Sequence, residues 1–87
     1  MDKLNISLLY VEEDVTLRNI YQKILEYSIK KVYVASDGLE GFENFKTYHP
    51  DIVLTDVRMP VMDGLDMIAK IRELDKDTRI IILSAFG

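Results

Sequence analysis

The chain has 87 residues, with 11 Lys and Arg against 15 Asp and Glu, so its formal net charge is −4. This acidic balance argues against binding to nucleic acid or anionic lipid through counterion release. The absence of cysteine excludes disulfides, a thiolate nucleophile and a zinc site of the cysteine type. No apolar run reaches the roughly 18 residues of a membrane span, and no signal-peptide pattern opens the chain. We therefore expect one small cytoplasmic domain, not bound to a membrane, whose partner is a protein or a small ion.

The first third of the chain predicts a strand followed by a helix. Residues 4–11, LNISLLYV, are apolar and β-prone, and they stop at an acidic cluster, as a strand does at its carboxyl end. Apolar residues then recur at spacings of three and four, which predicts a helix over residues 15–28 with Asp14 as its N-cap. The residues of this stripe are Leu17, Ile20, Tyr21, Ile24 and Leu25.

The remaining elements continue the same alternation. KVYVAS, residues 31–36, DIVLTD, residues 51–56, and TRIIILSA, residues 78–85, are predicted strands. Helices are predicted between them, and each is preceded by a capping pattern. The two cap pairs are Asp37 with Glu40 and Asp63 with Asp66, and the apolar helix residues are Leu39, Phe42 and Phe45, then Leu65, Ile68, Ile71 and Leu74.

Strands that alternate with helices in this way are typical of an α/β fold with a parallel sheet. The runs IVL and IIIL are apolar without alternation, as expected for strands covered on both faces. In such open sheets, ligands bind beyond the carboxyl ends of the strands. The search for a site therefore starts at these ends.

Acidic and hydroxyl side chains gather at the predicted carboxyl ends. Glu12 and Glu13 follow the first strand, Asp56 ends the third, and Ser84 ends the fourth. If the first and third strands are neighbours, about 4.8 Å apart, their carboxylates converge on one pocket. Crowded carboxylates repel, so the pocket either raises a carboxyl pKa or recruits a cation. Oxygen ligands without nearby His or Cys favour Mg²⁺, and a carboxylate beside that ion can act as a nucleophile toward phosphorus.

Four stretches, YVEEDVTLR, ASDG, PDIVLTDVRMPVMDG and IIILSA, resemble the response-regulator receiver domain of two-component signalling. The resemblance covers the whole chain, and Arg18 within the first stretch fixes the register of the acidic pair. It implies a flavodoxin-like, doubly wound parallel sheet with strand order 2-1-3-4. It also implies that residues 1–87 form one receiver domain, incomplete at its C-terminus, without the family's fifth strand and last helices.

By this resemblance, Asp56 would be phosphorylated by a sensor histidine kinase or a phosphotransfer protein, and Ser84 would donate a hydrogen bond to the phosphoryl group. Glu12, Glu13, Asp56 and the backbone carbonyl of Arg58 would bind Mg²⁺. The domain would be a phosphoacceptor rather than an enzyme, with intrinsic self-phosphorylation and autodephosphorylation. The family's lysine and aromatic switch residue fall beyond residue 87, so we expect weak phosphorylation, or none, of this chain.

Two alternatives belong to other classes of protein. A Mg²⁺-dependent phosphohydrolase would also use a strand-end aspartate, but those enzymes resemble one another in a second aspartate two residues later, where this chain has Arg58. An interaction module would instead bind another chain through the fourth strand and the apolar face of the first helix. Because long apolar edges rarely stay unpaired, we expect a homo-oligomer formed through these surfaces.

Overall fold

Strands and helices alternate strictly along the chain in the computed structural model, which describes residues 2–83. The order is β1 (Leu4–Val11), α1 (Val15–Ser28), β2 (Ile29–Ala35), α2 (Gly38–Tyr48), β3 (Ile52–Asp56), α3 (Gly64–Leu74) and β4 (Arg79–Leu83). The predicted bounds of β1 and α1 are confirmed. The second strand begins two residues before the predicted Lys31 because α1 ends directly at Ile29, whose N–H donates to the Leu25 carbonyl and whose backbone is already extended. The last two predicted residues of the fourth strand, Ser84 and Ala85, lie outside the described residues.

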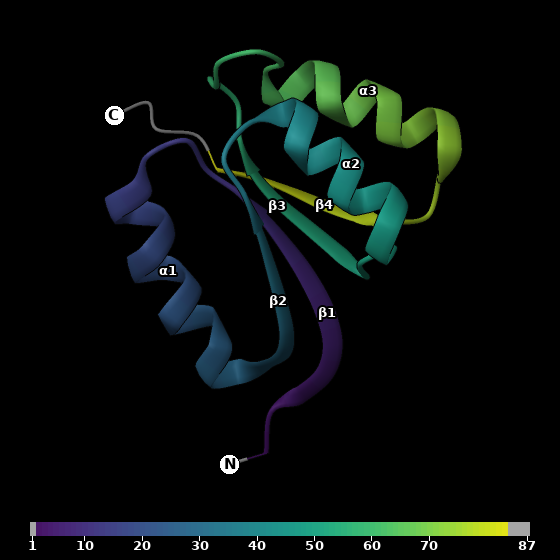
Figure 1. Ribbon diagram of the computed structural model, residues 1–87. Helices are drawn as coiled ribbons and strands as arrows, with labels where there is room; N and C mark the ends of the chain where they lie inside the picture. Colours follow the sequence, from purple (N-terminus) through teal and green to yellow (C-terminus); the bar gives the residue numbers. More distant parts are fainter. Residues whose placement is uncertain (1, 84–87) are drawn as a thin grey trace.

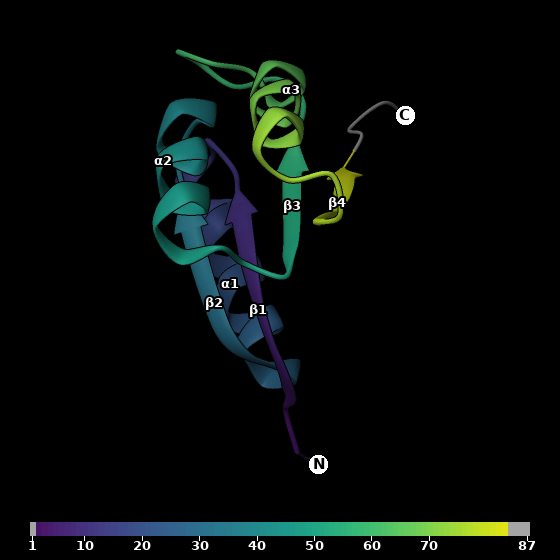
Figure 2. The ribbon, with the colours of Figure 1, turned by 90° about the vertical axis from the view of Figure 1, so that its right-hand side faces the viewer.

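The four strands form one parallel sheet in the order β2-β1-β3-β4, which confirms the predicted doubly wound α/β fold. Figure 2 shows the arrowheads of β1, β2 and β3 at the same end of the sheet. The register pairs Val11 of β1 with Ala35 of β2 on one side and with Thr55 of β3 on the other. Residues that directly follow these positions therefore lie together at one edge.

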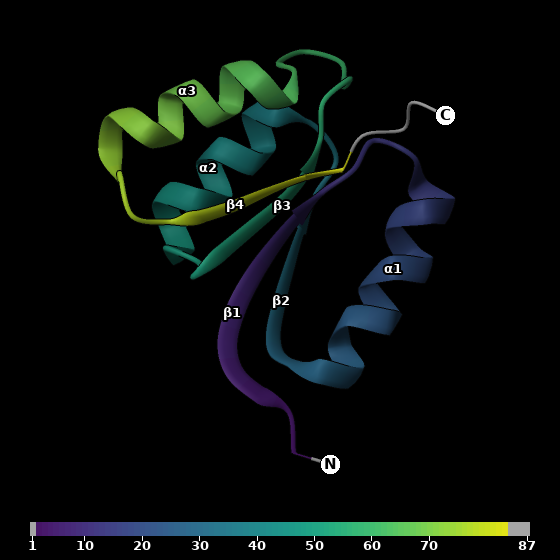
Figure 3. The same ribbon diagram turned by 180° about the vertical axis from the view of Figure 1, so that it is seen from behind.

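The helices divide unequally between the two faces of the sheet. Helices α2 and α3 lie on one face and α1 lies alone on the other (Figures 1 and 3). The face below α2 and α3 holds the larger core, which consists of Leu9, Val11, Ala35, Phe45, Val53, Met67 and Ile71. The face below α1 has a smaller cluster made of Leu8, Tyr10 and Ile29. No residue of α1 is buried, and Leu17, Ile20 and Ile24 remain 42%, 49% and 53% exposed.

Carboxylate caps fix the start of all three helices, as the sequence predicted. Asp14 Oδ1 accepts a hydrogen bond from the Leu17 N–H at 2.9 Å, and Asp37 and Asp63 make the equivalent bonds at 2.8 and 2.9 Å. Each cap satisfies an N–H group of the first helical turn that has no partner within the helix. Helices α1 and α3 thus begin at defined points, close behind the loops that follow β1 and β3.

The buried face of α3 includes only part of the predicted apolar stripe. Met67 and Ile71, one turn apart, are fully buried against the sheet. Leu65 and Leu74, which belong to the predicted apolar stripe, are 56% and 60% exposed. The buried stripe is therefore centred on Met67, because side chains four residues apart in a helix share one face.

Candidate functional site

Two carboxylates meet at the carboxyl edge of the sheet. Val11 of β1 pairs with Thr55 of β3. Since the strands are parallel, the residues that follow them, Glu12 and Asp56, lie beside one another. Both line a single pocket of about 340 Å³. The rest of the lining is largely apolar and comes from α1 and the sheet: Tyr10, Leu17, Tyr21, Ile24, Leu25, Leu54 and Leu83. The pocket is thus an apolar hollow with two acids on its wall.

Glu12 is held from several directions. Its side chain is only 6% exposed, and its Oε2 accepts a hydrogen bond from the Asp14 N–H at 3.0 Å. Its backbone N–H donates to the Ala35 carbonyl at 3.0 Å. The Arg18 guanidinium donates through Nη1 to the carbonyl of Glu12 at 2.8 Å and to that of Glu13 at 3.3 Å. The sequence pointed to Arg18 only as an alignment marker, whereas in the structure it ties the acidic loop to α1.

Asp56 is positioned by the loop that follows β3. Its Oδ1 accepts a hydrogen bond from the Val57 N–H at 2.7 Å, and the Gly64 N–H donates to the Val57 carbonyl at 2.7 Å. A Cβ at position 64 would lie 2.1 Å from the backbone oxygen of Asp56, so only glycine permits this approach. Asp56 itself is half-buried. Its carboxylate is therefore oriented by the backbone and still borders the pocket.

Tyr10 places a hydroxyl beside these acids. The residue is 1% exposed, and burial, followed by the negative charge of Glu12, raises its pKa to about 12. The charges of Tyr21 and Asp56 and a hydrogen bond to the Glu12 carboxylate act in the same direction. The hydroxyl consequently stays protonated near neutral pH. Sequence analysis did not single out Tyr10, which lines the same pocket as Glu12 and Asp56.

The predicted site residues are brought together only in part. Glu12 and Asp56 share the pocket, whereas Glu13 is exposed in the loop after β1 and is not among the described residues that line it. Arg58 is exposed two residues beyond Asp56, and Ser84 lies outside the described residues. Within residues 2–83, no three His, Cys, Asp or Glu side chains form a group that could hold a metal ion. Of the three expected carboxylates, Glu12 and Asp56 line the pocket, and Glu13 is exposed in the loop that follows β1.

The donor set of this pair nevertheless suits Mg²⁺. The ion keeps several waters and is commonly bound through one or two carboxylates, and carboxylate oxygens are the ligands it prefers. Glu12 and Asp56 supply such oxygens in one hollow, without a competing nitrogen or sulfur ligand among the residues that line it. The residues present are therefore compatible with a hard cation.

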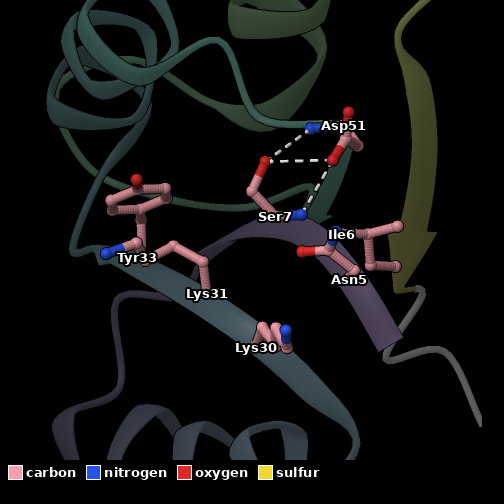
Figure 4. Close-up of a pocket in the computed structure, with 7 residues that line it drawn as sticks. All are labelled: Asn5, Ile6, Ser7, Lys30, Lys31, Tyr33 and Asp51. Carbon is pink, nitrogen blue, oxygen red and sulfur yellow. Dashed lines mark hydrogen bonds between the residues drawn. The ribbon is translucent and has the colours of Figure 1, made fainter. Parts of the chain in front are cut away.

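A second hollow lies at the opposite end of the sheet (Figure 4). It is open to solvent, has a volume of about 480 Å³, and is lined by Asn5, Ile6, Ser7, Lys30, Lys31, Tyr33 and Asp51. Its carboxylate is already used, because Asp51 Oδ2 accepts from the N–H and the Oγ of Ser7 at 2.8 and 3.2 Å. This pair fastens the start of β3 to β1 beside a register shift between β1 and β2. We interpret it as a structural clamp.

Comparison with known proteins identifies the class. The model of the response regulator receiver domain family matches residues 8–87, and the chain belongs to this family. The chain is 34% identical over 81 residues to the chemotaxis protein CheY of Halobacterium salinarum, covering 93% of this chain and 68% of that protein. The crystal structure of the N-terminal domain of an uncharacterized protein from Wolinella succinogenes has a TM-score of 0.89 and 34% identity, covering 94% of this chain and 66% of the other.

A further similar structure contains both a metal ion and a partner protein. The crystal structure of the CheX-CheY-BeF3-Mg²⁺ complex from Borrelia burgdorferi has a TM-score of 0.81 and 33% identity, and it covers 94% of this chain and 63% of that chain. The family thus places this chain in two-component signalling, among phosphoacceptor domains rather than enzymes of the usual kind. No helix within residues 2–83 is long and apolar enough to span a membrane.

Proposed function

We propose that the chain is a phosphoacceptor switch in which Asp56 accepts a phosphoryl group from a phosphohistidine of a sensor kinase or a phosphotransfer protein. A carboxylate oxygen of Asp56 attacks phosphorus, the bond between nitrogen and phosphorus breaks, and the histidine ring nitrogen keeps the electron pair. An aspartyl phosphate forms. The observation that carries the proposal is the shared pocket, in which the half-buried Asp56 lies beside the buried Glu12 at the carboxyl edge of the sheet.

The metal-binding part of the proposal assigns Glu12, Glu13, Asp56 and the backbone carbonyl of Arg58 as the groups that would hold Mg²⁺. The bound ion would offset the charge of the incoming phosphoryl group. The chain's own residues supply the rest of the site: Glu12 Oε2 accepts from the Asp14 N–H, and Asp56 Oδ1 accepts from the Val57 N–H. Ser84 remains our proposed donor to the phosphoryl group. We keep the cytoplasm as the proposed location, together with intrinsic self-phosphorylation and autodephosphorylation.

A small acyl phosphate donor tests the assignment of the phosphoacceptor. The chain is incubated with the donor and Mg²⁺, and intact mass followed by peptide mapping locates any phosphoryl group. We expect a low level of label confined to Asp56, which Asp56→Asn abolishes and which removal of Mg²⁺ reduces. Asp77→Asn, a change of the same kind on an exposed loop residue, is the matched control and should retain the label. Label on another residue, or label that persists in Asp56→Asn, would contradict the assignment.

The same preparation separates a switch from a phosphohydrolase. A switch takes up at most one phosphoryl group and releases it slowly, whereas a hydrolase turns over phosphomonoesters repeatedly. We expect no repeated turnover. If the chain released phosphate steadily from a phosphomonoester, and if this release required Asp56, the protein would be a phosphohydrolase and our proposal would be wrong.

We also propose self-association through exposed apolar residues of α1 and β4. Ile81, Ile82 and Leu83 of β4 are 50%, 46% and 40% exposed, and the apolar stripe of α1 is similarly open. Apolar surface of this kind favours association. Size-exclusion chromatography with light scattering should show a dimer or larger species, and a monomer at high concentration would count against this part of the proposal.

A further inference from the structure

We propose that Gly38, the first residue of α2, is a positioning residue for the phosphoacceptor, because its close contact with Met62 holds the loop that follows Asp56. The inference rests on the proposed function, since it assumes that Asp56 accepts the phosphoryl group. Gly38 itself would contact neither the phosphoryl group nor a metal ion. It acts through residues 57–63, which connect β3 to α3.

The first turn of α2 donates a hydrogen bond to this loop. The Gly38 N–H is one of the groups at a helix start that have no partner within the helix, and it donates to the Met62 carbonyl at 2.9 Å. This carbonyl lies at the positive end of the helix dipole, which favours the contact. The start of α2 is itself fixed, because the Asp37 carboxylate accepts from the Glu40 N–H at 2.8 Å and the Glu40 carboxylate accepts from the Ser36 N–H at 2.6 Å. The loop is therefore attached to a well-anchored helix end.

Gly38 also leaves room for the loop to approach α2. A Cβ at position 38 would lie 2.1 Å from the Met62 oxygen, 2.8 Å from the Met62 carbonyl carbon and 3.0 Å from the Asp63 oxygen. All three are backbone atoms, which cannot rotate away as a side chain does. The φ of Gly38 is not positive, so space rather than backbone conformation requires glycine here. A larger residue would push the loop off the helix.

The loop contains a strained residue whose conformation such a contact explains. Val61 has a φ of 67°, in the left-handed region that β-branched residues rarely adopt. The Met62 N–H donates to the Pro60 carbonyl at 2.7 Å, which closes a tight turn around Val61. Val61 is 78% exposed, so packing of its own side chain does not hold this turn. Strain persists only where the surroundings impose it. Here the Gly38 N–H and the packing of Met59 and Met62 against the larger core supply that constraint.

The same loop orients Asp56 at its other end. Asp56 Oδ1 accepts from the Val57 N–H, and the Val57 carbonyl accepts from the Gly64 N–H, each at 2.7 Å. Residues 57–63 are thus held by backbone hydrogen bonds both at Val57 and at Met62. Because a short segment fixed at both ends transmits a shift along its length, a displacement of Met62 moves Val57 and the carboxylate that its N–H orients.

The test compares Gly38→Ala with Gly41→Ala, the same change in the next turn of α2. The atoms nearest to a Cβ at position 41 are side-chain atoms, with the Met67 Sδ at 2.6 Å and the Val11 Cγ2 at 3.0 Å. Both variants are incubated with a small acyl phosphate donor and Mg²⁺, at a folded fraction matched by circular dichroism. A misplacement of about 1 Å can cost about 100-fold in rate, so we expect Gly38→Ala to slow the labelling of Asp56 by about 10- to 100-fold. Gly41→Ala should label as fast as the unaltered chain, and equal rates in the two variants would overturn the proposal.

Backbone amide NMR gives a second readout that needs no phosphorylation. The Val57 and Gly64 resonances should shift in Gly38→Ala and stay in place in Gly41→Ala. Resonances of Val57 and Gly64 that do not move in Gly38→Ala would overturn the proposal, and so would equal shifts in the two variants.

A measurement on the unaltered chain covers the case in which Gly38→Ala does not fold. A scalar coupling across the hydrogen bond should join the Gly38 nitrogen to the Met62 carbonyl carbon, and its absence would overturn the contact. Failure of the proposed function gives a different pattern, in which the unaltered chain takes up no label at Asp56 while the loop resonances still respond to Gly38→Ala.

Discussion

Replacement of Gly64 by alanine tests how the structure positions Asp56. The added Cβ would lie 2.1 Å from the Asp56 backbone oxygen, and within 3.1 Å of the Asp56 carbonyl carbon and the Val57 Cα. Backbone atoms cannot rotate away as a side chain does, so the loop after β3 must move. Forced backbone shifts of this kind cost about 1–3 kcal/mol. Helix propensity works in the other direction, because alanine is better than glycine in a helix by up to about 1 kcal/mol.

The clash predicts a lower free energy of unfolding and the helix propensity predicts a higher one, so a measurement of the stability of Gly64→Ala distinguishes them. We expect the clash to dominate and the free energy of unfolding to fall by about 1–2 kcal/mol, a decrease in Tm of roughly 5–15 °C for a domain of this size. Thermal and urea unfolding followed by circular dichroism measure both quantities. Leu65→Ala, at an exposed position in the same helical turn, is the control and should shift Tm by only a few degrees. A Gly64→Ala variant as stable as the unaltered chain, or more stable, would refute the close approach.

Three further changes test the core and the titrating groups. Met67→Ala removes a fully buried side chain and should lower the free energy of unfolding by about 2–5 kcal/mol, whereas Leu74→Ala, at a 60% exposed position of the same helix, should cost far less in urea unfolding. The pKa of Tyr10 is raised from an ordinary 10.0 to about 12 in the fold. The contribution of the protonated hydroxyl to the free energy of unfolding is therefore fully present below pH 10 and is lost as pH rises toward 12. Tyr10→Phe should therefore flatten the alkaline fall in Tm, and an unchanged alkaline limb would contradict the assignment. The hydrogen bond from Thr78 Oγ1, at 2.6 Å, lowers the pKa of Asp75 below its ordinary 3.8, so its contribution is present above that pH and is lost as pH falls further. Asp75→Asn should reduce the acid-side loss of Tm, and an acid limb identical to that of the unaltered chain would argue against it.

The sequence predicted the fold well because its local patterns agree with one another. The apolar runs of the strands, the helical spacing of α1 and the three carboxylate caps all indicate the same β-α alternation, and the caps proved to be real hydrogen bonds. The predicted apolar stripe of α3 was inexact where tertiary packing decides. Leu65 and Leu74 belong to that stripe, but their contacts with the rest of the fold leave them 56% and 60% exposed.

The site was predicted in outline, and its details depended on geometry. The strand order brought Glu12 and Asp56 together as expected from neighbouring strands. Glu13, the second member of the expected acidic pair, is exposed in the loop after β1, and its part in the site stays a prediction. Arg18 was not expected to hold the acidic loop, because a hydrogen bond from its side chain to a backbone carbonyl six residues earlier is not visible in a sequence pattern.

Titration of Mg²⁺ followed by backbone amide NMR tests most directly whether the two strand ends form one cation-binding pocket. We predict saturable shifts centred on the amides of Glu12, Asp56 and Val57, with the same shifts absent in Asp56→Asn. Weak changes spread over the acidic surface without saturation, or a response that is the same in Asp56→Asn, would contradict the shared pocket on which the proposed function depends.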